Sequence, residues 1–231
     1  MPSITLDHVV KSYGSVSALH DVSAVIADGA RCALVGRSGA GKSTVLRVVA
    51  GLERPDSGRV LFDDRDVTHV APSERGVAMV FQDLSLYPHM TVRANLAYPL
   101  KLRGVPREER EARVVETAKR MELSAVLDRR PGSISGGEQQ RTALARALVI
   151  EAGVWLLDEP FGQLDTRLRR RLERLLLELH AATRATIMHV THDQDEAERL
   201  ADHIIVMTPG GIAQSGAPTE LRRDDDGLWR E

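Results

Sequence analysis

Residues 36–44 read Gly36-Arg37-Ser38-Gly39-Ala40-Gly41-Lys42-Ser43-Thr44. This stretch fits the pattern G-x-x-x-x-G-K-[ST], in which a glycine-rich loop wraps around phosphate groups. The apolar run over residues 31–35 predicts a buried strand before the loop, and residues 44–51 predict a helix after it. The pattern needs this strand–loop–helix order, because a helix N-terminus attracts the phosphate.

The residue types in the loop suit a bound polyphosphate. Its glycines leave the backbone amides open to an anion, since no side chain stands between them. Lys42 adds a full positive charge for the β- and γ-phosphates, and the Ser43 hydroxyl is placed to ligate Mg²⁺. For an isolated pattern, the alternative is a glycine-rich turn with a solvated lysine.

Composition excludes several classes of protein. The 231-residue chain has a net charge of −2 and a pI of about 6.5, which argues against a dedicated nucleic-acid binder. No apolar run approaches the roughly 18 residues that span a bilayer, and no signal peptide is evident. We therefore expect any membrane association to go through a partner. The single cysteine, Cys32, is expected to be a core residue of a protein in a reducing compartment.

Alternating strands and helices predict one α/β domain over residues 1–231, with a mostly parallel sheet. We assign residues 1–90 and 151–231 to a nucleotide-binding core that includes a small N-terminal antiparallel β subdomain. Residues 91–150 are helical in composition and predict an inserted helical subdomain. Thr91 is expected to cap its first helix, and the polar tail over residues 222–231 is expected to be frayed. Further buried strands are expected over residues 76–81, 154–159, 186–190 and 204–207, and further helices over residues 166–183 and 193–200.

Polar residues follow several of these strands. Asp158 ends a strand, where a carboxylate can bind Mg²⁺, and the adjacent Glu159 can act as the general base for a water. His192 can donate to a γ-phosphate or orient the water, and Gln82 can reach the metal or the water. Taken singly, the Asp–Glu pair is as often a helix cap or turn, and a lone histidine or glutamine is more often structural.

A second anion site is predicted at Ser135-Gly136-Gly137-Glu138. Ser135 is a natural helix cap, and the two glycines expose the amides of the helix N-terminus. A second phosphate site is useful if two copies of the chain face each other and each completes the other's site. The alternative is an ordinary glycine-rich cap.

Three further expectations concern exposure. Tyr13, just after the first strand, can stack on an adenine or pack on the sheet edge. The loop over residues 83–90 contains apolar residues that look exposed, namely Leu84, Leu86, Tyr87 and Met90. The arginines of the helix over residues 166–183 are expected to form a solvated face (Arg167, Arg169, Arg170, Arg171 and Arg174).

Together the motifs resemble those of the ATPase subunits of ABC transporters over nearly the whole chain. The matching order runs from Tyr13 and the phosphate loop through Gln82, Ile134-Ser135-Gly136-Gly137-Glu138, Leu156-Leu157-Asp158-Glu159-Pro160 and Leu164-Asp165 to Thr191-His192-Asp193. The sequence of residues 76–92 resembles the corresponding segment in the ATPases of bacterial sugar, glycerol-phosphate and polyamine importers, the maltose-importer type.

The resemblance implies a P-loop NTPase core that uses ATP and Mg²⁺. Catalysis would rest on Glu159, His192 and Gln82, and the metal would bind Ser43, Gln82 and Asp158. Each ATP would lie between the phosphate loop of one subunit and the Ser135 segment of the other. The residues implied at the nucleotide are Tyr13, Gly36, Arg37, Ser38, Gly39, Ala40, Gly41, Lys42, Ser43, Thr44, Ser135, Gly136, Gly137, Glu138 and Asp165.

The resemblance also implies partners. Two ATPase subunits, identical or different, would close head to tail and drive a pair of transmembrane permease subunits at the cytoplasmic face of the membrane. The loop from Gln82 to Met90 and the helical subdomain would grip the permease. An extracytoplasmic solute-binding protein would act indirectly, and no nucleic acid is expected.

Some positions depart from the family pattern. Ile134 and Glu138 stand where Leu and Gln are commonest, and Glu138 would either place a carboxylate near the γ-phosphate or point outward. Gly162-Gln163 replaces the usual Ser-Asn, and Asp195 stands where an apolar residue is common. Because the chain stops soon after its last hairpin, the C-terminal regulatory domain of this subgroup is expected to be absent, by nature or by truncation.

Two other functions stay open at this point. An ATPase of an exporter or lipoprotein-release system would carry the same catalytic residues, although the sequence after Gln82 argues against this function. An ABC ATPase acting on DNA would have long coiled coils between the phosphate loop and the Ser135 segment, where this chain is compact. Translation-associated relatives usually carry two such domains in one chain.

Overall fold

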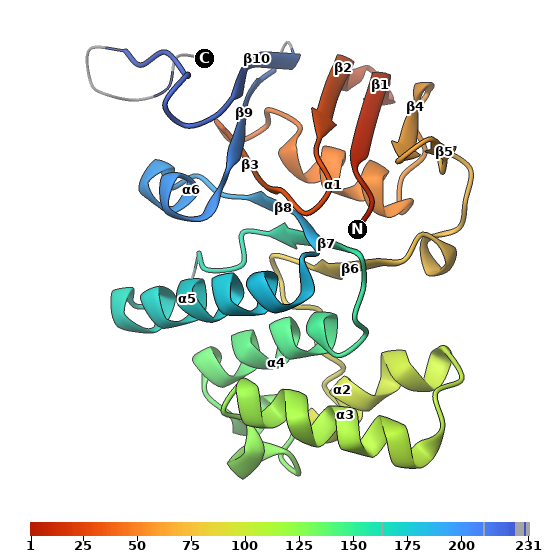
Figure 1. Ribbon diagram of the computed structural model, residues 1–231, viewed down its shortest axis with the longest axis vertical. Helices are drawn as coiled ribbons and strands as arrows, with labels where there is room; N and C mark the ends of the chain where they lie inside the picture. The colour runs from red at the N-terminus through yellow and green to blue at the C-terminus, as the bar shows by residue number, and fades with distance from the viewer. Residues whose placement is uncertain (163, 210, 225–228, 230–231) are drawn as a thin grey trace.

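Two β-sheets occupy one end of the molecule and a group of helices the other (Figure 1). The computed structural model describes residues 1–162, 164–209, 211–224 and 229. The first sheet has the strand order β2-β1-β4-β5 and is antiparallel throughout. Its strands are β1 (Ile4–Tyr13), β2 (Val16–Ile26), β4 (Ser57–Phe62) and β5 (Arg65–Asp66).

The larger sheet has the strand order β10-β9-β3-β8-β7-β6. Neighbouring strands from β9 to β6 run parallel, and β10 pairs antiparallel with β9. The expected α/β fold, with a mostly parallel sheet and a separate antiparallel sheet, is confirmed. The strands are β3 (Arg31–Gly36), β6 (Val77–Val80), β7 (Val154–Asp158), β8 (Thr186–Val190), β9 (His203–Thr208) and β10 (Gly211–Gly216).

Helix starts follow the capping residues in the sequence. Thr91 Oγ1 accepts a hydrogen bond from the Ala94 amide, which confirms the expected cap of α2. Asp165 and Asp193 cap α5 and α6 in the same way. The helices are α1 (Lys42–Ala50), α2 (Val92–Leu102), α3 (Arg107–Arg120), α4 (Gly136–Leu148), α5 (Thr166–Thr183) and α6 (Gln194–Leu200), with short 3₁₀ turns at Pro72–Glu74, Ser124–Val126 and Pro131–Ser133.

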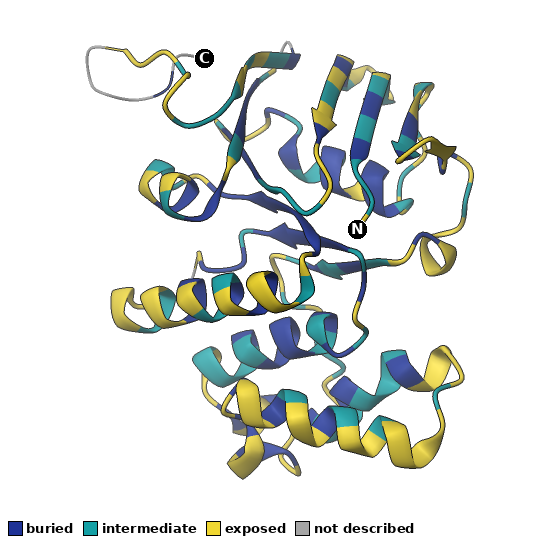
Figure 2. Cartoon of the chain, in the orientation of Figure 1, coloured by how far each residue is buried: buried dark blue, intermediate teal, exposed yellow. Residues whose placement is uncertain are grey.

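Strand β7 separates two apolar cores. Successive side chains of a strand point to opposite faces, so Val154 and Leu156 enter the core that α1 shares with both sheets. Trp155 and Leu157 enter the second core, with α2–α5. Burial on both faces explains why this strand reads as a continuous apolar run. Figure 2 shows the result, a buried central sheet with the outer faces of α3 and α5 exposed.

The loop after β6 differs from its expected exposure. Leu84 and Leu86 are only partly exposed and pack against the core around α2–α5. Arg146 of α4 fixes this loop, because its guanidinium donates to the carbonyls of Ser85 at 2.6 Å and Leu84 at 3.0 Å. The exposed apolar side chains near this loop are instead Leu52 and Leu102.

The expectation of a frayed tail is wrong for Trp229, which is 2% exposed. Its indole packs against the apolar side chains of α6 and of strands β3 and β9, and its amide donates to Gln194 Oε1 at 3.1 Å. Residues 225–228, 230 and 231 lie outside the described residues. Within the part of the chain that the structure describes, no helix combines the length and apolar character needed to cross a membrane.

Candidate nucleotide-binding site

The carboxyl ends of three parallel strands bring the predicted site residues together. In register, Leu34 of β3 and Asp158 of β7 both pair with Val190 of β8. Loop 36–44, Asp158-Glu159 and Thr191-His192 therefore leave the sheet at the same edge. In open α/β sheets, ligands bind at this edge.

The phosphate loop needs glycine at two positions for reasons of space. Gly36 has a φ of 142°, and a Cβ there would lie 2.1 Å from the Met207 carbonyl oxygen. Gly41 has a φ of 92°, and its Cβ would lie 2.4 Å from the Ala18 carbonyl oxygen. Gly39 has a φ of 85° but no neighbouring atom within 4 Å. The tight curl therefore depends on close backbone approach as well as on backbone freedom.

Lys42 lies inside this curl. Its side chain is buried, and its Nζ donates to the carbonyl oxygens of Gly36 at 2.7 Å and Arg37 at 2.8 Å. The loop is thereby folded around an ammonium group at the N-terminus of α1. This arrangement supplies positive charge where a phosphate would bind.

Ser43 and Asp158 form the predicted pair for a divalent cation. Ser43 Oγ donates to Asp158 Oδ1 at 3.0 Å, and Asp158 is 5% exposed. Burial raises the pKa of Asp158, the hydrogen bond from Ser43 opposes this, and the charge of Glu159 adds to the rise. A cation at this point would stabilise the buried carboxylate, and an oxygen pair suits Mg²⁺. The residues therefore fit the metal, with the remaining ligands to come from phosphate and water.

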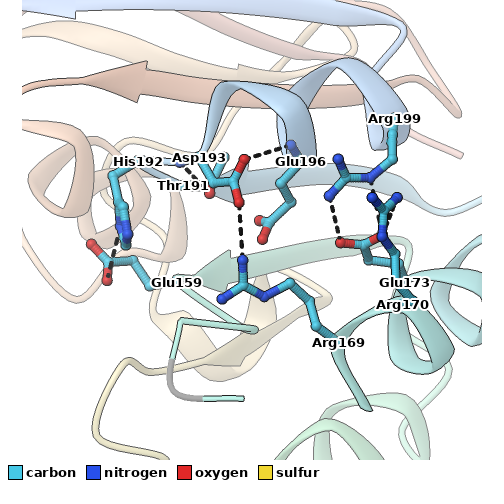
Figure 3. Close-up of polar contacts among 9 residues, drawn as sticks. All are labelled: Glu159, Arg169, Arg170, Glu173, Thr191, His192, Asp193, Glu196 and Arg199. Carbon is cyan, nitrogen blue, oxygen red and sulfur yellow. Dashed lines mark hydrogen bonds and ion pairs between the residues drawn. The ribbon is translucent and has the colours of Figure 1, made fainter. Parts of the chain in front are cut away.

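Glu159 lies between the other two predicted catalytic residues. Its Oε2 accepts from Gln82 Nε2 at 3.1 Å and lies 3.7 Å from His192 Nδ1, a pair drawn in Figure 3. Its φ of 46° is left-handed, which costs a non-glycine residue about 1–3 kcal/mol. The Glu159 amide donates to the Val190 carbonyl at 3.1 Å, which fixes the strained turn onto β8. The structure thus brings Gln82, Glu159 and His192 together.

At the second predicted anion site, Ser135 caps α4 as expected and Glu138 completes a capping box. Glu138 Oε2 accepts from the Ser135 amide at 2.8 Å and from Ser135 Oγ at 2.9 Å, which lowers the pKa of Glu138. The carboxylate therefore turns back onto its own helix. Gly137 packs against α5, since a Cβ there would lie 2.5 Å from Leu168 Cδ2, whereas Gly136 is open.

The remaining predicted nucleotide contacts are at the surface. Tyr13 is 44% exposed, with Lys11 Nζ 5.3 Å from its ring centroid, so the ring is accessible rather than packed in a core. Asp165 Oδ1 accepts from the Arg167 and Leu168 amides, both at 3.0 Å, and its carboxylate is used to cap α5. Gln163 lies outside the described residues.

Sequence reasoning missed a cluster of charged residues between α5 and α6. Arg169, expected on a solvated face, is half-buried and donates to Asp193 Oδ2 at 2.9 Å. Glu173 is buried and binds Arg199, and Glu196 is 3% exposed. The missed signal is helical spacing, because Arg169 and Glu173 share the face of the buried Leu172 and Leu176.

This geometry defines a class of site, a phosphate-binding loop with a hydroxyl–carboxylate pair for a cation at the edge of a parallel sheet. Across the described residues, no group of three or more His, Cys, Asp and Glu side chains forms a metal site from protein atoms alone.

Comparison with known proteins agrees with this class. The sequence profile of the family described as ABC transporter matches residues 19–162. The chain belongs to the ABC transporter family. It is 49% identical, over 94% of its length, to a sulfate/thiosulfate import ATP-binding protein of Thermosynechococcus vestitus, and 49% identical, over 96%, to an sn-glycerol-3-phosphate import ATP-binding protein of Rhizobium meliloti. The chain spans 65% and 64% of the length of these two relatives.

Solved structures show the same architecture. A dimeric, post-hydrolysis state of the ATP-binding cassette MJ0796 bound to ADP and Pi superposes with a TM-score of 0.85 at 31% identity. The match covers 93% of this chain and 98% of that chain. The ADP conformation of the cassette MJ1267 gives a TM-score of 0.82 at 29% identity, covering 95% of this chain and 93% of that one.

Proposed function

We propose that this chain binds Mg-ATP in loop 36–44 and hydrolyses it, with Glu159 as the general base. The observation that carries this proposal is the meeting of the carboxyl ends of β6, β7 and β8 at one sheet edge, where Glu159 Oε2 accepts from Gln82 Nε2 and lies 3.7 Å from His192 Nδ1. The buried Lys42 and the Ser43–Asp158 pair lie at the start of α1, next to this edge. Phosphoryl transfer depends chiefly on such positioned charges.

Different residues of the chain would bind the metal, bind the phosphates and activate the water. Ser43 and Asp158, with Gln82, would hold Mg²⁺, which supplies charge neutralisation of the phosphates when bound. Lys42 and the loop amides bind and orient the phosphates. Glu159 accepts a proton from the attacking water, and His192 orients the water or the γ-phosphate. Tyr13 is free to stack on the adenine.

The functional unit is proposed to be a head-to-tail dimer with a second ATPase subunit, identical or different. Ser135, Gly136 and Gly137 of one subunit would then contact the nucleotide in the other, beside the Asp165 loop. The support is the open space at Gly136, the first residue of α4, and the dimeric post-hydrolysis state of MJ0796, at 31% identity.

We further propose that the dimer drives a permease pair of a binding-protein-dependent importer from the inner face of the membrane. Two relatives are named as import ATP-binding proteins, for sulfate/thiosulfate and for sn-glycerol-3-phosphate. A groove of about 380 Å³ lies between the sheet and α2, where a permease segment would bind. Its lining includes the exposed Leu52 and Leu102, with Met79, Tyr87 and Arg146.

The hydrolysis proposal is tested with Glu159→Gln in the full chain. ATP binding should persist while turnover falls by at least about 100-fold, because a general base contributes about that factor. The exposed Glu151→Gln is the matched control and should keep wild-type turnover, because Glu151 pairs with Arg113 far from this edge. Near-normal turnover by Glu159→Gln would overturn the assignment.

The transport proposal is tested by mild cross-linking and affinity capture from membranes of the source organism, read by mass spectrometry. Recovery of two multi-span proteins and an extracytoplasmic binding protein supports an importer. Recovery of a permease without a binding protein would indicate an exporter, and recovery of soluble proteins alone would contradict transport.

A further inference from the structure

His192 is positioned by its chain neighbours more than by its own side chain. The imidazole is 67% exposed, and its Nδ1 lies 3.7 Å from Glu159 Oε2, beyond hydrogen-bond distance. Such a side chain needs a fixed backbone if it is to meet a γ-phosphate or a water in one geometry. The residues on either side of His192 supply this constraint.

Thr191 and Asp193 are both tightly bound. The Thr191 amide donates to the Leu34 carbonyl of β3 at 3.2 Å, and Thr191 Oγ1 accepts from the Asp193 amide at 3.1 Å. Asp193 uses its two carboxylate oxygens differently. Oδ1 caps α6 by accepting from the Glu196 amide at 3.0 Å, and Oδ2 accepts from Arg169 Nη1 at 2.9 Å (Figure 3).

Arg169 lies one turn after the start of α5. Its amide donates to the Asp165 carbonyl at 2.9 Å, so it follows directly on the loop at Leu164 and Asp165. A short path of bonded groups therefore runs from Asp165 through Arg169 and Asp193 to the backbone of His192. The path links the loop proposed to face the second subunit with the group proposed to contact the γ-phosphate.

The surroundings make the Arg169 charge hard to replace. Glu196 is buried beside Asp193, and Glu173 is buried on the same side of α5. Arg199 binds Glu173 through Nη2 at 2.9 Å and Nε at 3.2 Å, while Arg170 lies 3.9 Å from Glu173. With Arg199 committed to Glu173, Arg169 is the guanidinium bound to Asp193. Its removal would leave the Asp193 carboxylate without that partner in a crowded acidic site.

We propose that Arg169 is a positioning residue for hydrolysis, which acts through Asp193 to fix the backbone on which His192 stands. The proposal rests on the ATPase function proposed above. It assigns to α5 a role in ordering the γ-phosphate side of the site, although Arg169 itself contacts no reacting atom.

The test compares Arg169→Met with Asp193→Asn in the full chain. Asparagine caps a helix as well as aspartate, so Asp193→Asn removes the charge pair while an oxygen remains for the Glu196 amide. Both variants should lower kcat by about 10- to 100-fold, as expected for a displaced catalytic group, and leave the Kd for ATP within about twofold. The double variant should be no slower than either single variant.

Arg171→Met is the matched control. Arg171 also lies on α5 and pairs with a carboxylate, Glu122, but this pair faces the helical end of the molecule rather than α6. The control should keep wild-type kcat. Arg169→Lys, which keeps the charge but loses the planar guanidinium, should recover part of the activity.

A His192→Ala background separates the positioning role from a purely structural one. If Arg169 acts by positioning His192, its loss should not reduce the residual turnover of His192→Ala further, because no imidazole is left to position. A purely structural role predicts the same loss in both backgrounds. An equal further loss in that background, or wild-type kcat in Arg169→Met, would overturn the proposal. If Arg169→Met does not fold, the kcat values of Asp193→Asn and Arg169→Lys still test the positioning role. Absence of turnover in the wild-type chain would instead contradict the ATPase function itself.

Discussion

Gln82 Nε2 lies 3.1 Å from Glu159 Oε2, although the two residues are 77 positions apart in the sequence. The same oxygen faces His192 Nδ1 at 3.7 Å. The proposed general base therefore has polar partners on two sides, and its Gln82 partner belongs to the loop proposed to meet the permease. Movement of that loop would change the environment of the base directly.

Gln82→Ala should show whether Gln82 contributes to ATP binding through the metal or through the nucleotide. If Gln82 ligates Mg²⁺, the variant should bind ATP about 10-fold more weakly in Mg²⁺ but with wild-type affinity in EDTA, since altered metal environments cost about 10–100-fold. Equilibrium titration with a fluorescent ATP analogue measures both values. Equal weakening in Mg²⁺ and in EDTA would remove Gln82 from the metal site.

Gly36→Ala should destabilise the fold far more than Gly39→Ala. Both glycines have positive φ, but only the Gly36 Cβ meets a backbone oxygen, at 2.1 Å. We expect about 3 kcal/mol for Gly36→Ala and about 1 kcal/mol for Gly39→Ala. Thermal unfolding should show a Tm loss of about 6–12 °C against about 2–4 °C. Similar losses in the two variants would contradict the close approach to Met207.

Ser135→Arg should abolish turnover and leave ATP binding by the isolated monomer largely unchanged. Ser135 hydrogen-bonds within its own helix, so in a monomer the larger side chain has no nucleotide to displace. Ser133→Arg, two residues earlier and also exposed, is the control that should still turn over ATP. Loss of ATP binding in the Ser135→Arg monomer would mean that the segment does not serve a second subunit.

Glu196 should make stability depend on pH. Burial is the main cause that raises the pKa of Glu196 from 4.5 to about 7, with Asp193 and Glu173 adding to the rise and Thr191 and Arg169 opposing it. Between these two pKa values the folded protein keeps the Glu196 proton and the unfolded chain has lost it. The stability that comes from the raised pKa is therefore fully present below about pH 4.5 and is lost as pH rises through about 7.

Glu196→Gln mimics the protonated form and should therefore lose this dependence. Its advantage over wild type in free energy of unfolding should grow by roughly 2–3 kcal/mol between about pH 5 and about pH 8. Urea unfolding of both chains at the two pH values measures the difference. A constant difference across this range would show that Glu196 ionises normally in the folded protein.

The sequence was sufficient for the strands, the helix starts and the phosphate loop. Local chemistry decides these features, because caps such as Thr91 and Ser135 satisfy backbone amides within a few residues. The expected roles of Gln82, Glu159 and His192 at one nucleotide agree with their meeting at one edge, since parallel strands that alternate with helices bring their carboxyl ends together.

Long-range packing decided what the sequence left unpredicted. The Arg169–Asp193 pair joins residues 24 positions apart, and an arginine-rich stretch is most often solvated. Trp229 is buried because α6 and the sheet leave an apolar surface beside it. Leu84 and Leu86 pack inward because Arg146 fixes the carbonyls of their loop. None of these partners lies close to its residue in the sequence.

The place of β3 within the larger sheet has a consequence during protein synthesis. Its neighbours β8 and β9 begin at Thr186 and His203, long after the phosphate loop has left the ribosome. Ser43 likewise meets Asp158 only after another 115 residues. The topology therefore implies that a nascent chain has no finished nucleotide site until β8 and β9, which end at Val190 and Thr208, have been made, so bound ATP can stabilise the fold only from that point in synthesis.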